Sequence, residues 1–382
     1  MKIDDKTSHN SPSIRFPEFT GEWKEERLSE IADIYKGAGI SKDQLSDNGE
    51  PCILYGELYT KYKTETITEV ISRTDIDNTK LVRSKANDVI IPCSGETAED
   101  IATARCVIKD GILLGGDLNI IRLHNYDGSF VSYQLNGKRK YDIAKVAQGV
   151  SVVHLYGEHL KGVKTVNPCL AEQKKISRFL SLLDERIAVQ NRLIEKLQSL
   201  IGGIAQHCIK EAISGSMGIK LGDICKITTG KLDANAQVDN GLYPFFTCAE
   251  QPFKIDNFAF DTEALLISGN GANLGYVNYY NGKFNAYQRT YVLDAFSENI
   301  QYIKWALKVL LPKRIAIEKS SSNTPYIVLS TLSDLRLPIP SKGNQCHMAE
   351  LMQSLERKLS NQIALKSSYN MLKQYLLRQM FI

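Results

Sequence analysis

The 382-residue sequence predicts a mixed α/β protein in which two similar domains are joined by an antiparallel two-helix coiled coil. Three observations predict this fold. One short sequence pattern recurs 193 residues apart, a strict heptad repeat follows the first copy, and a second long helical stretch follows the second copy. The order along the chain is therefore globule, helix, globule, helix, and we expect a pseudo-twofold axis between the halves.

The duplication is visible in matched positions along the chain. At the offset of 193, the matches are Arg27–Ile34 with Lys220–Ile227, Gly37 with Gly230, and Pro51 with Pro244. Further on, Gln173 matches Gln345 at an offset of 172, shortly after Pro168 and Pro340. The falling offset predicts that the second globule is shorter because it has lost loops.

Four segments follow from this pattern. They are a first domain over residues 1–169, a first spacer helix over 170–213, a second domain over 214–341 and a second spacer helix over 342–382. Within the domains, short apolar runs such as Val89–Ile91 and Ala264–Ile267 predict buried strands broken by glycine turns. The amphipathic stretch Tyr302–Leu311 predicts a helix.

The first spacer helix carries a coiled-coil seam, because apolar residues recur with the 4-3 spacing of a heptad and Gln190 is the one polar member. The seam consists of Ile176, Leu180, Leu183, Ile187, Gln190, Ile194, Leu197, Ile201, Ile204 and Cys208. In the second helix the pattern runs through Met348, Met352, Leu355, Leu359 and Gln362, and then shifts to Leu365, Tyr369, Leu372 and Leu376. Such a shift is typical of a stammer in a coiled coil.

Gln190 and Gln362 lie near the middle of their helices. If the helices pair lengthwise in opposite directions, the axis brings these two side chains together, and a polar pair in a seam helps to set the register. We therefore predict a Gln190–Gln362 contact. The alternative is that both side chains are partly exposed and contribute no energy.

Composition excludes several classes of protein. There are 47 Lys and Arg against 43 Asp and Glu, and 43% of the residues are hydrophobic, which excludes a largely disordered polyelectrolyte. No apolar run approaches the roughly 20 residues of a membrane helix, so no membrane partner is expected. The polar start lacks the apolar core of a secretory signal, which favours the cytoplasm as the location.

Motifs for catalysis are missing from the sequence. It contains no GxxxxGK[ST], no HExxH and no GxSxG. Eight scattered cysteines form no CxxC pair, so we expect reduced thiols and no metal site. His154 and His159 are single histidines beside apolar segments, either acid–base groups or packed side chains. We expect no catalytic residue in this chain.

Two similar globules on a stiff spacer suit a protein that reads two separated marks on a long partner. Duplex DNA is such a partner, because half-sites recur along its groove about 34–36 Å apart per helical turn. The two globules differ in sequence, so we expect the two half-sites to differ as well. This describes an asymmetric, bipartite target.

The start of the chain resembles a known family. Arg15–Phe19, Gly21 and Trp23 are similar to the usual opening of the specificity subunit of type I restriction–modification systems. The stretch from Gln148 to Ile176 is similar to the family's junction between a target-recognition domain and its spacer helix.

The second half repeats that junction, from Ser320 through Leu329 and Leu335 to Pro340, so the resemblance covers essentially the whole chain. There are two departures. Asn344 stands where the pattern has Glu, before Gln345, and the second half has no counterpart of the Phe-Pro/Trp opening.

The resemblance implies a DNA-sequence-specificity subunit with no catalytic site of its own. It implies double-stranded DNA and two methyltransferase subunits as partners, with two restriction subunits joining where the system also cleaves. S-adenosylmethionine, ATP and Mg²⁺ would belong to those partners, and no cofactor to this chain. Phe179 and Leu182 are candidates for docking the partners; the alternative is that they only complete the packing onto the first globule.

Polar and basic residues in glycine-punctuated loops are the candidates for DNA contact, because Arg, Asn and Gln read base edges and Lys contacts phosphates. In the first domain these are Lys36, Lys61, Lys63, Arg73, Lys85, Ser94 and Gln148. In the second they are Lys231, Asn270, Asn273, Gln288, Arg289, Ser321 and Asn323. For each one, the alternative is an ordinary solvated side chain.

Two other functions remain open. One is a non-enzymatic coiled-coil adaptor whose two heads bind proteins, and the other is an enzyme that fuses restriction and methylation. Sequence-specific DNA binding together with a methyltransferase partner distinguishes the specificity subunit from the adaptor. Binding of S-adenosylmethionine by the isolated chain would point to the enzyme.

Overall fold

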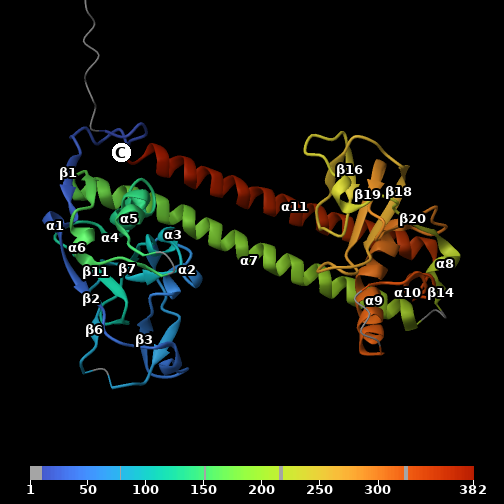
Figure 1. Ribbon diagram of the computed structural model, residues 1–382, viewed down its shortest axis with the longest axis horizontal. Coiled ribbons are helices and arrows are strands. Elements are labelled where there is room, and N and C mark those ends of the chain that lie inside the picture. Colours follow the sequence, from blue (N-terminus) through green and yellow to red (C-terminus); the bar gives the residue numbers. More distant parts are fainter. Residues whose placement is uncertain (1–10, 78, 150–151, 215–217, 322–325) are drawn as a thin grey trace, which may run out of the picture. The chain divides into compact units, whose positions relative to one another are not determined.

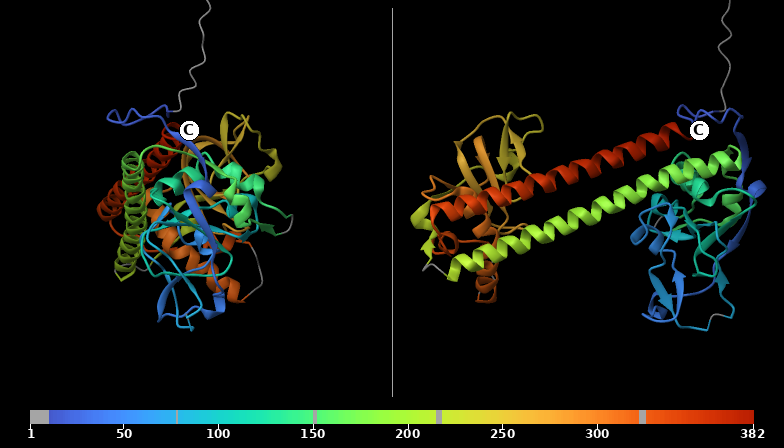
Figure 2. Two further views of the ribbon diagram at one scale, coloured as in Figure 1. Left: turned by 90° about the vertical axis from the view of Figure 1, so that its left-hand side faces the viewer. Right: turned by 180° about the vertical axis from the view of Figure 1, so that it is seen from behind.

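A computed structural model of the chain describes residues 11–77, 79–149, 152–214, 218–321 and 326–382. The chain divides into two compact units (Figures 1 and 2). Unit 1 contains residues 1–191 and 365–382, and unit 2 contains residues 192–364. Each unit therefore holds one α/β domain and one segment of each long helix.

Unit 1 is built around a five-stranded sheet with the strand order β2-β11-β7-β9-β4. The strands are β2 (Ala32–Lys36), β4 (Thr66–Ile67), β7 (Asp88–Pro92), β9 (Arg105–Val107) and β11 (Leu118–Leu123). All five residues of β7 are buried. Val89 and Ile91 belong to one hydrophobic cluster, whereas Ile90 belongs to another, because successive side chains of a strand point to opposite faces. The apolar run that predicted a buried strand thus supplies both faces of the sheet.

Shorter elements complete unit 1. The other strands are β1 (Lys24–Arg27), β3 (Glu50–Ile53), β5 (Ser72–Thr74), β6 (Val82–Arg83), β8 (Ser94–Gly95), β10 (Leu113–Leu114), β12 (Val153–His154) and β13 (Lys164–Asn167). The short helices are α1 (Leu28–Ile31), α2 (Glu57–Thr60), α3 (Ala98–Ile101), α4 (Gly128–Asn136), α5 (Lys140–Val146) and α6 (Gly157–Lys161). A second sheet, β5-β3-β10-β6, packs over the cluster that contains Ile53 and Leu114.

Unit 2 has one six-stranded sheet with the order β15-β20-β18-β19-β16-β17. The strands are β15 (Lys226–Thr229), β16 (Tyr243–Phe246), β17 (Phe253–Ile255), β18 (Phe260–Ser268), β19 (Val277–Ala286) and β20 (Thr290–Asp294), with β14 (Ile219–Lys220) and β21 (Arg336–Leu337) as a separate pair. The helices are α8 (Leu221–Ile224), α9 (Ile300–Ser321) and α10 (Leu329–Ser333). Leu265 and Ile267 of β18 share a cluster with Tyr302 and Leu307 of α9, which contains the predicted helix Tyr302–Leu311.

The two long helices are α7 (Leu170–Ser214) and α11 (Lys342–Gln379). Each begins in one unit and ends in the other, and the two run in opposite orders between the units. Inside each unit, buried residues of both helices belong to one cluster. In unit 1 these are Ile176, Leu180, Leu376 and Leu377, and in unit 2 they are Ile201, Ala205, Ile209, Met348 and Met352. Gln190 falls in unit 1 and Gln362 in unit 2, so their contact stays a prediction.

The predicted repeat is present in the backbone hydrogen bonds. The N–H of Leu28 donates to the carbonyl of Val163 at 2.9 Å, and the N–H of Leu221 donates to the carbonyl of Leu335 at 2.9 Å. The donors Leu28 and Leu221 are 193 residues apart in the sequence, and the acceptors Val163 and Leu335 are 172 residues apart. These are the two offsets that the sequence repeat predicts. Among the strands, β2 pairs with β11 as β15 pairs with β20. Most of the difference in offset arises before β7, where unit 1 carries three of the four strands of its second sheet.

Gln173 and Gln345 make the same pair of hydrogen bonds. The side-chain oxygen of Gln173 accepts from the N–H of Asp127 at 2.9 Å, and its nitrogen donates to the carbonyl of Pro168 at 2.8 Å. The oxygen of Gln345 accepts from the N–H of Asn299 at 3.0 Å, and its nitrogen donates to the carbonyl of Pro340 at 3.0 Å. Each glutamine thereby ties the start of a long helix to the residue that caps α4 or α9.

Two details differ from the sequence reading. The second junction is predicted to run through Leu329 and Leu335, as the first runs through Leu155 and Leu160. In the structure, Leu155 matches Ile327 and Leu160 matches Leu332, because Leu155 and Ile327 make the equivalent backbone hydrogen bonds to Cys93 and Gly269.

The second difference concerns the end of α11. Leu365 is 39% exposed and Leu372 is 45% exposed, whereas Lys366 and Lys373 beside them are half-buried. The less exposed positions of α11 thus keep the regular 4-3 spacing of a heptad, and the predicted stammer is absent from this helix. Lys366 and Lys373 occupy two of these positions in place of apolar residues.

Candidate nucleic-acid interface

The structure gathers five of the predicted DNA-contact residues of unit 2 around the turn between β19 and β20. We call this group, with its neighbour Tyr326, the Arg289 cluster. Its members are Lys231, Asn270, Asn273, Gln288, Arg289 and Tyr326. The guanidinium carbon of Arg289 lies 5.8 Å from the centre of the Tyr326 ring, and Asn270 forms a β-bridge with Tyr326. The N–H of Gln288 donates to the carbonyl of Leu232, next to Lys231, at 2.9 Å.

Close backbone approaches determine the shape of this cluster. The N–H of Gly269 donates to the carbonyl of Arg289 at 2.8 Å, and the carbonyl of Gly269 accepts from Ile327 at 2.8 Å. A side chain at position 269 would collide with the carbonyl oxygen of Arg289. The side-chain amide of Asn273 donates to the carbonyl of Cys248 at 3.0 Å, which holds the glycine-rich loop against the sheet.

Three of the predicted residues of unit 1 come together in a second group, the Ser94 cluster, which consists of Lys36, Ser94, Asp117, Gln148 and His154. The hydroxyl of Ser94 donates to the carboxylate of Asp117 at 3.3 Å, and the Lys36 ammonium lies 4.0 Å from that carboxylate. Ser94 also pairs with His154, and His154 exchanges two backbone hydrogen bonds with Gln148.

The two clusters occupy equivalent places in the repeated fold. Asp117 corresponds to Arg289, because Cys93 and Gly269 donate their N–H groups to these two carbonyls. Ser94 corresponds to Asn270 and His154 to Tyr326, because each pair forms the same antiparallel bridge. One framework therefore presents an acid beside a lysine in unit 1 and an arginine over a tyrosine in unit 2.

The groups beneath the clusters are held in their neutral forms. Burial raises the pKa of the Cys93 thiol to about 11, with a smaller opposing effect of Lys36. Burial also raises the pKa of Tyr291, and Arg289 opposes this shift. The Tyr291 hydroxyl donates to the carbonyl of Ile327 at 2.9 Å, which fixes the backbone next to Tyr326.

The remaining candidates lie elsewhere. The Lys61 ammonium is 2.7 Å from the Glu57 carboxylate, and the Arg73 guanidinium donates to the carbonyl of Gly49 at 2.8 Å. The Lys63 ammonium donates to the carbonyl of Tyr59 at 3.2 Å, and Lys85 is an exposed residue between β6 and β7. Ser321 ends α9, and Asn323 lies outside the described residues.

The sequence analysis missed Asp117 and Tyr326 as members of these clusters. The offset of 172 could have found both, because it leads from Arg289 to Asp117 and from His154 to Tyr326. Residue type alone could not, because Tyr326 is neither one of the basic residues nor one of the amides that predict DNA contact.

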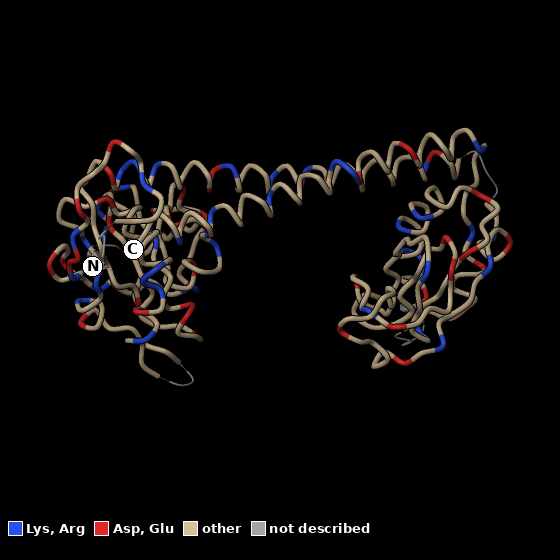
Figure 3. Tube along the Cα trace, turned by 90° about the horizontal axis from the view of Figure 1, so that it is seen from above, with Lys and Arg blue, Asp and Glu red and all other residues tan. Residues whose placement is uncertain are grey.

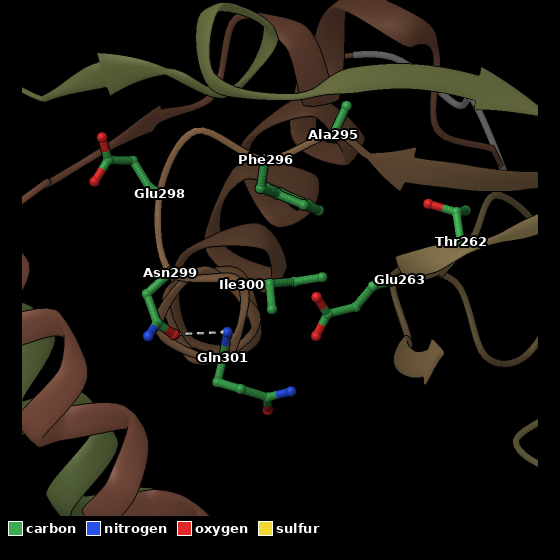
Figure 4. A pocket seen from close by; sticks show the side chains of 8 residues that line it. All are labelled: Thr262, Glu263, Ala295, Phe296, Glu298, Asn299, Ile300 and Gln301. Carbon is green, nitrogen blue, oxygen red and sulfur yellow. Dashed lines mark hydrogen bonds between the residues drawn. The ribbon is translucent and has the colours of Figure 1, made fainter. Parts of the chain in front are cut away.

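A pocket of about 570 Å³ lies at the start of α9 (Figure 4). Glu263 and Glu298 line it, and the side-chain oxygen of Asn299 accepts from the N–H of Gln301 at 3.0 Å. Two carboxylates repel phosphate, so this pocket does not suit the nucleic-acid backbone.

Charged residues of both signs are mixed along each unit (Figure 3). Among the described residues, no group of three His, Cys, Asp or Glu side chains is placed to hold a metal ion, and all eight cysteines are free thiols. No described helix is long and apolar enough to span a membrane.

Comparisons with known proteins agree with the repeated architecture. The family model for the type I restriction modification DNA specificity domain matches residues 20–199 and 214–366. The specificity subunit of the type I restriction enzyme EcoDI of Escherichia coli is 42% identical over 137 residues, which is 36% of this chain and 30% of that protein. The specificity subunit of the enzyme MjaVIII of Methanocaldococcus jannaschii is 23% identical over 385 residues, covering 90% of this chain and 87% of that protein.

Solved structures show the same fold. The S subunit of the type I restriction–modification system of M. genitalium matches with a TM-score of 0.70 at 20% identity, covering 97% of this chain and 99% of that one. A chain from a study of assembly and conformational transition of the type I R-M system matches with a TM-score of 0.55 at 16% identity, covering 94% and 97%. The predicted fold class is therefore confirmed.

Proposed function

Because this chain belongs to the family of type I restriction modification DNA specificity domains, we propose that it selects the DNA sequence on which a type I restriction–modification complex acts. The observation that carries this proposal is the recurrence of one loop framework with different side chains, the Ser94 cluster in unit 1 and the Arg289 cluster in unit 2. The family match disfavours the adaptor and the enzyme as alternatives.

In this proposal each α/β domain reads one half-site in double-stranded DNA. Arg289, Asn270 and Gln288 have the donor and acceptor geometry to read base edges, and Lys36 and Lys231 contact phosphates. Asp117 accepts a hydrogen bond from an exposed amino group, such as that of cytosine in the major groove. Unlike clusters then read unlike half-sites, which makes the target bipartite and asymmetric.

The long helices set the spacing between the half-sites in this proposal. At 1.5 Å per residue, the 45 residues of α7 extend for roughly 68 Å. This length is about two turns of B-DNA. The division into recognition domains over 1–169 and 214–341 and spacer helices over 170–213 and 342–382 belongs to the same proposal.

We place two methyltransferase subunits, and two restriction subunits where the system cleaves, against the spacer helices. Support comes from exposed apolar side chains that recur at the offset of 172. The matched pairs are Leu193 with Leu365, and Leu200 with Leu372. Each of these four side chains is between 39% and 51% exposed. S-adenosylmethionine, ATP and Mg²⁺ belong to those partners, and the complex works in the cytoplasm.

Adenine-methylation mapping tests the function. DNA from cells that carry the methyltransferase is compared with and without this chain. We expect methylation at one bipartite sequence only when the chain is present. Methylation that is independent of the chain, or spread over unrelated sequences, contradicts the proposal. Co-purification of the methyltransferase with Leu193→Arg, against the exposed polar control Gln198→Ala, tests the docking surface separately.

A further inference from the structure

A groove of about 550 Å³ lies in unit 2 between the end of α7 and the start of α11. We call it the second-half groove and define it by six lining residues: His207, Cys208, Tyr302, Asn344, His347 and Leu351. Leu351 is 39% exposed, whereas Tyr302 forms a buried floor. None of the residues that line the groove belongs to the Arg289 cluster.

In unit 1 the equivalent surface is covered by the start of the chain. The Arg15 guanidinium makes two contacts of 2.7 Å with the Glu172 carboxylate. The Phe16 ring packs edge-to-face on Phe179, with ring centres 5.8 Å apart, and the Lys175 ammonium lies 4.7 Å from the Phe16 ring centre.

Three more contacts hold the same segment. The N–H of Ile14 donates to the carbonyl of Gln379 at 3.0 Å. Glu18 forms an ion pair with Lys175. The Trp23 ring packs edge-to-face on Phe130, with centres 5.8 Å apart. The segment from Ile14 to Trp23 is thus seated on both long helices and on α4.

Five of the residues that receive this segment have their counterparts in the second-half groove. At the offset of 172 the pairs are Phe130 with Tyr302, Glu172 with Asn344, Lys175 with His347, Phe179 with Leu351, and Gln379 with His207. Glu172 is 1% exposed beneath its covering segment, whereas Asn344 is exposed. The groove therefore corresponds to the surface of unit 1 that binds the segment from Ile14 to Trp23. No such segment from the described part of the chain covers the groove.

The second half has no sequence to fill the groove. Thirteen described residues, 11–23, precede β1 in unit 1, whereas only four positions separate the end of α7 at Ser214 from the start of β14 at Ile219. None of those four positions carries an aromatic residue. The connection between α7 and β14 therefore does not supply a covering segment like that of unit 1, which favours another polypeptide as its source.

We propose that the second-half groove binds an extended segment of a partner polypeptide that carries an aromatic side chain followed two positions later by an acidic one. The aromatic ring packs on Leu351 as Phe16 packs on Phe179. The acidic side chain meets His347 as Glu18 meets Lys175. Asn344 replaces the carboxylate of Glu172, so a neutral polar residue is favoured before the aromatic one, where unit 1 has Arg15.

A labelled synthetic peptide with the sequence of residues 11–23 and the change Arg15→Asn is the probe, and the full-length chain is the receptor. We expect saturable one-to-one binding below about 1 mM. Leu351→Arg should weaken it at least tenfold. Ile363→Arg is the matched control, because Ile363 is an apolar residue of the same helix that is 47% exposed and lies outside the groove. Phe16→Ala in the peptide should abolish binding.

Three results would overturn the proposal. One is the absence of saturable binding by the full-length chain, and another is equal loss of binding by Leu351→Arg and Ile363→Arg. The third is sensitivity to Phe179→Arg but not to Leu351→Arg, because the peptide would then be displacing the native segment in unit 1. The assay needs neither DNA nor a methyltransferase, so its outcome is independent of the proposed function.

Discussion

The Lys373 ammonium lies 2.6 Å from the Asp184 carboxylate, which joins the end of α11 to α7 inside unit 1. The same ammonium lies 2.7 Å from the Glu65 carboxylate and 5.6 Å from the centre of the Tyr133 ring. The Tyr133 hydroxyl donates to Asp184 at 2.6 Å. The last turns of the chain are therefore bound to the first domain by a buried charged network.

Replacing Lys373 by methionine should destabilise unit 1. The change keeps the length of the side chain but leaves the buried Glu65 and Asp184 carboxylates without their cation, at a cost of about 3–5 kcal/mol. Urea unfolding measures the loss, with the exposed Lys358→Met on the same helix as the control. Equal midpoints for the two variants would show that the network contributes no stability.

The same network predicts a loss of stability at alkaline pH. Burial lowers the pKa of Lys373, but the attraction of Glu65 and Asp184 outweighs burial, and the net pKa is raised. The stabilisation is therefore complete below the ordinary lysine pKa of about 10.4 and is lost as the pH rises through the folded value. Unfolding midpoints recorded from about pH 9 upward should fall more steeply for the natural chain than for Lys373→Met. Parallel curves would refute this assignment.

Gln173→Ala and Gln345→Ala should destabilise the protein to a similar extent. Each glutamine is 1% exposed, and its loss leaves a backbone N–H and a carbonyl without a partner, which costs about 1–3 kcal/mol. Chemical unfolding compares both variants with Gln198→Ala, an exposed position on α7. If only one variant were destabilised, the two junctions would not be energetically equivalent.

Arg289→Ala should relax recognition at one base pair of the second half-site, at a cost of about 1–3 kcal/mol in binding to the natural target. Lys231→Ala should instead weaken binding to all sequences and reduce the dependence of affinity on salt by about one counterion. Methylation mapping and salt titration of DNA binding separate the two effects. An unchanged methylation pattern with Arg289→Ala would remove this arginine from the set of base-reading residues.

Gly269→Ala should disturb the second half-site alone. The added methyl group collides with the carbonyl oxygen of Arg289, so the turn that carries Arg289 must shift, whereas the Ser94 cluster has Cys93 at this place and is unaffected. Gly203→Ala is the control, because a methyl group there meets nothing within 4 Å. Methylation mapping should show altered bases in one half-site only, and changes in both halves would contradict the prediction.

Periodic features of the fold could be predicted because they depend on local spacing. The heptads of α7 predicted a long helix, and the run Val89–Ile91 predicted a strand buried on both faces. The prediction for the end of α11, that Leu365 and Leu372 face inward, was wrong. Leu365 and Leu372 are more apolar than Lys366 and Lys373, yet the lysines are half-buried because Glu65 and Asp184 offset the charge of Lys373. Hydrophobicity cannot report such a pairing between residues far apart in the sequence.

The duplicated order of globule and helix, the family and the mixed α/β class were determined by the sequence itself, because repeats and heptads are patterns along the chain. Which polar residues form one surface depends instead on how the chain folds. Strand pairing brings Ser94, Asp117 and His154 together. The fold also places the start of the chain on a surface of unit 1 whose counterpart in unit 2, the second-half groove, has no such segment from the described part of the chain. Such juxtapositions depend on contacts between distant residues, and no local pattern encodes them.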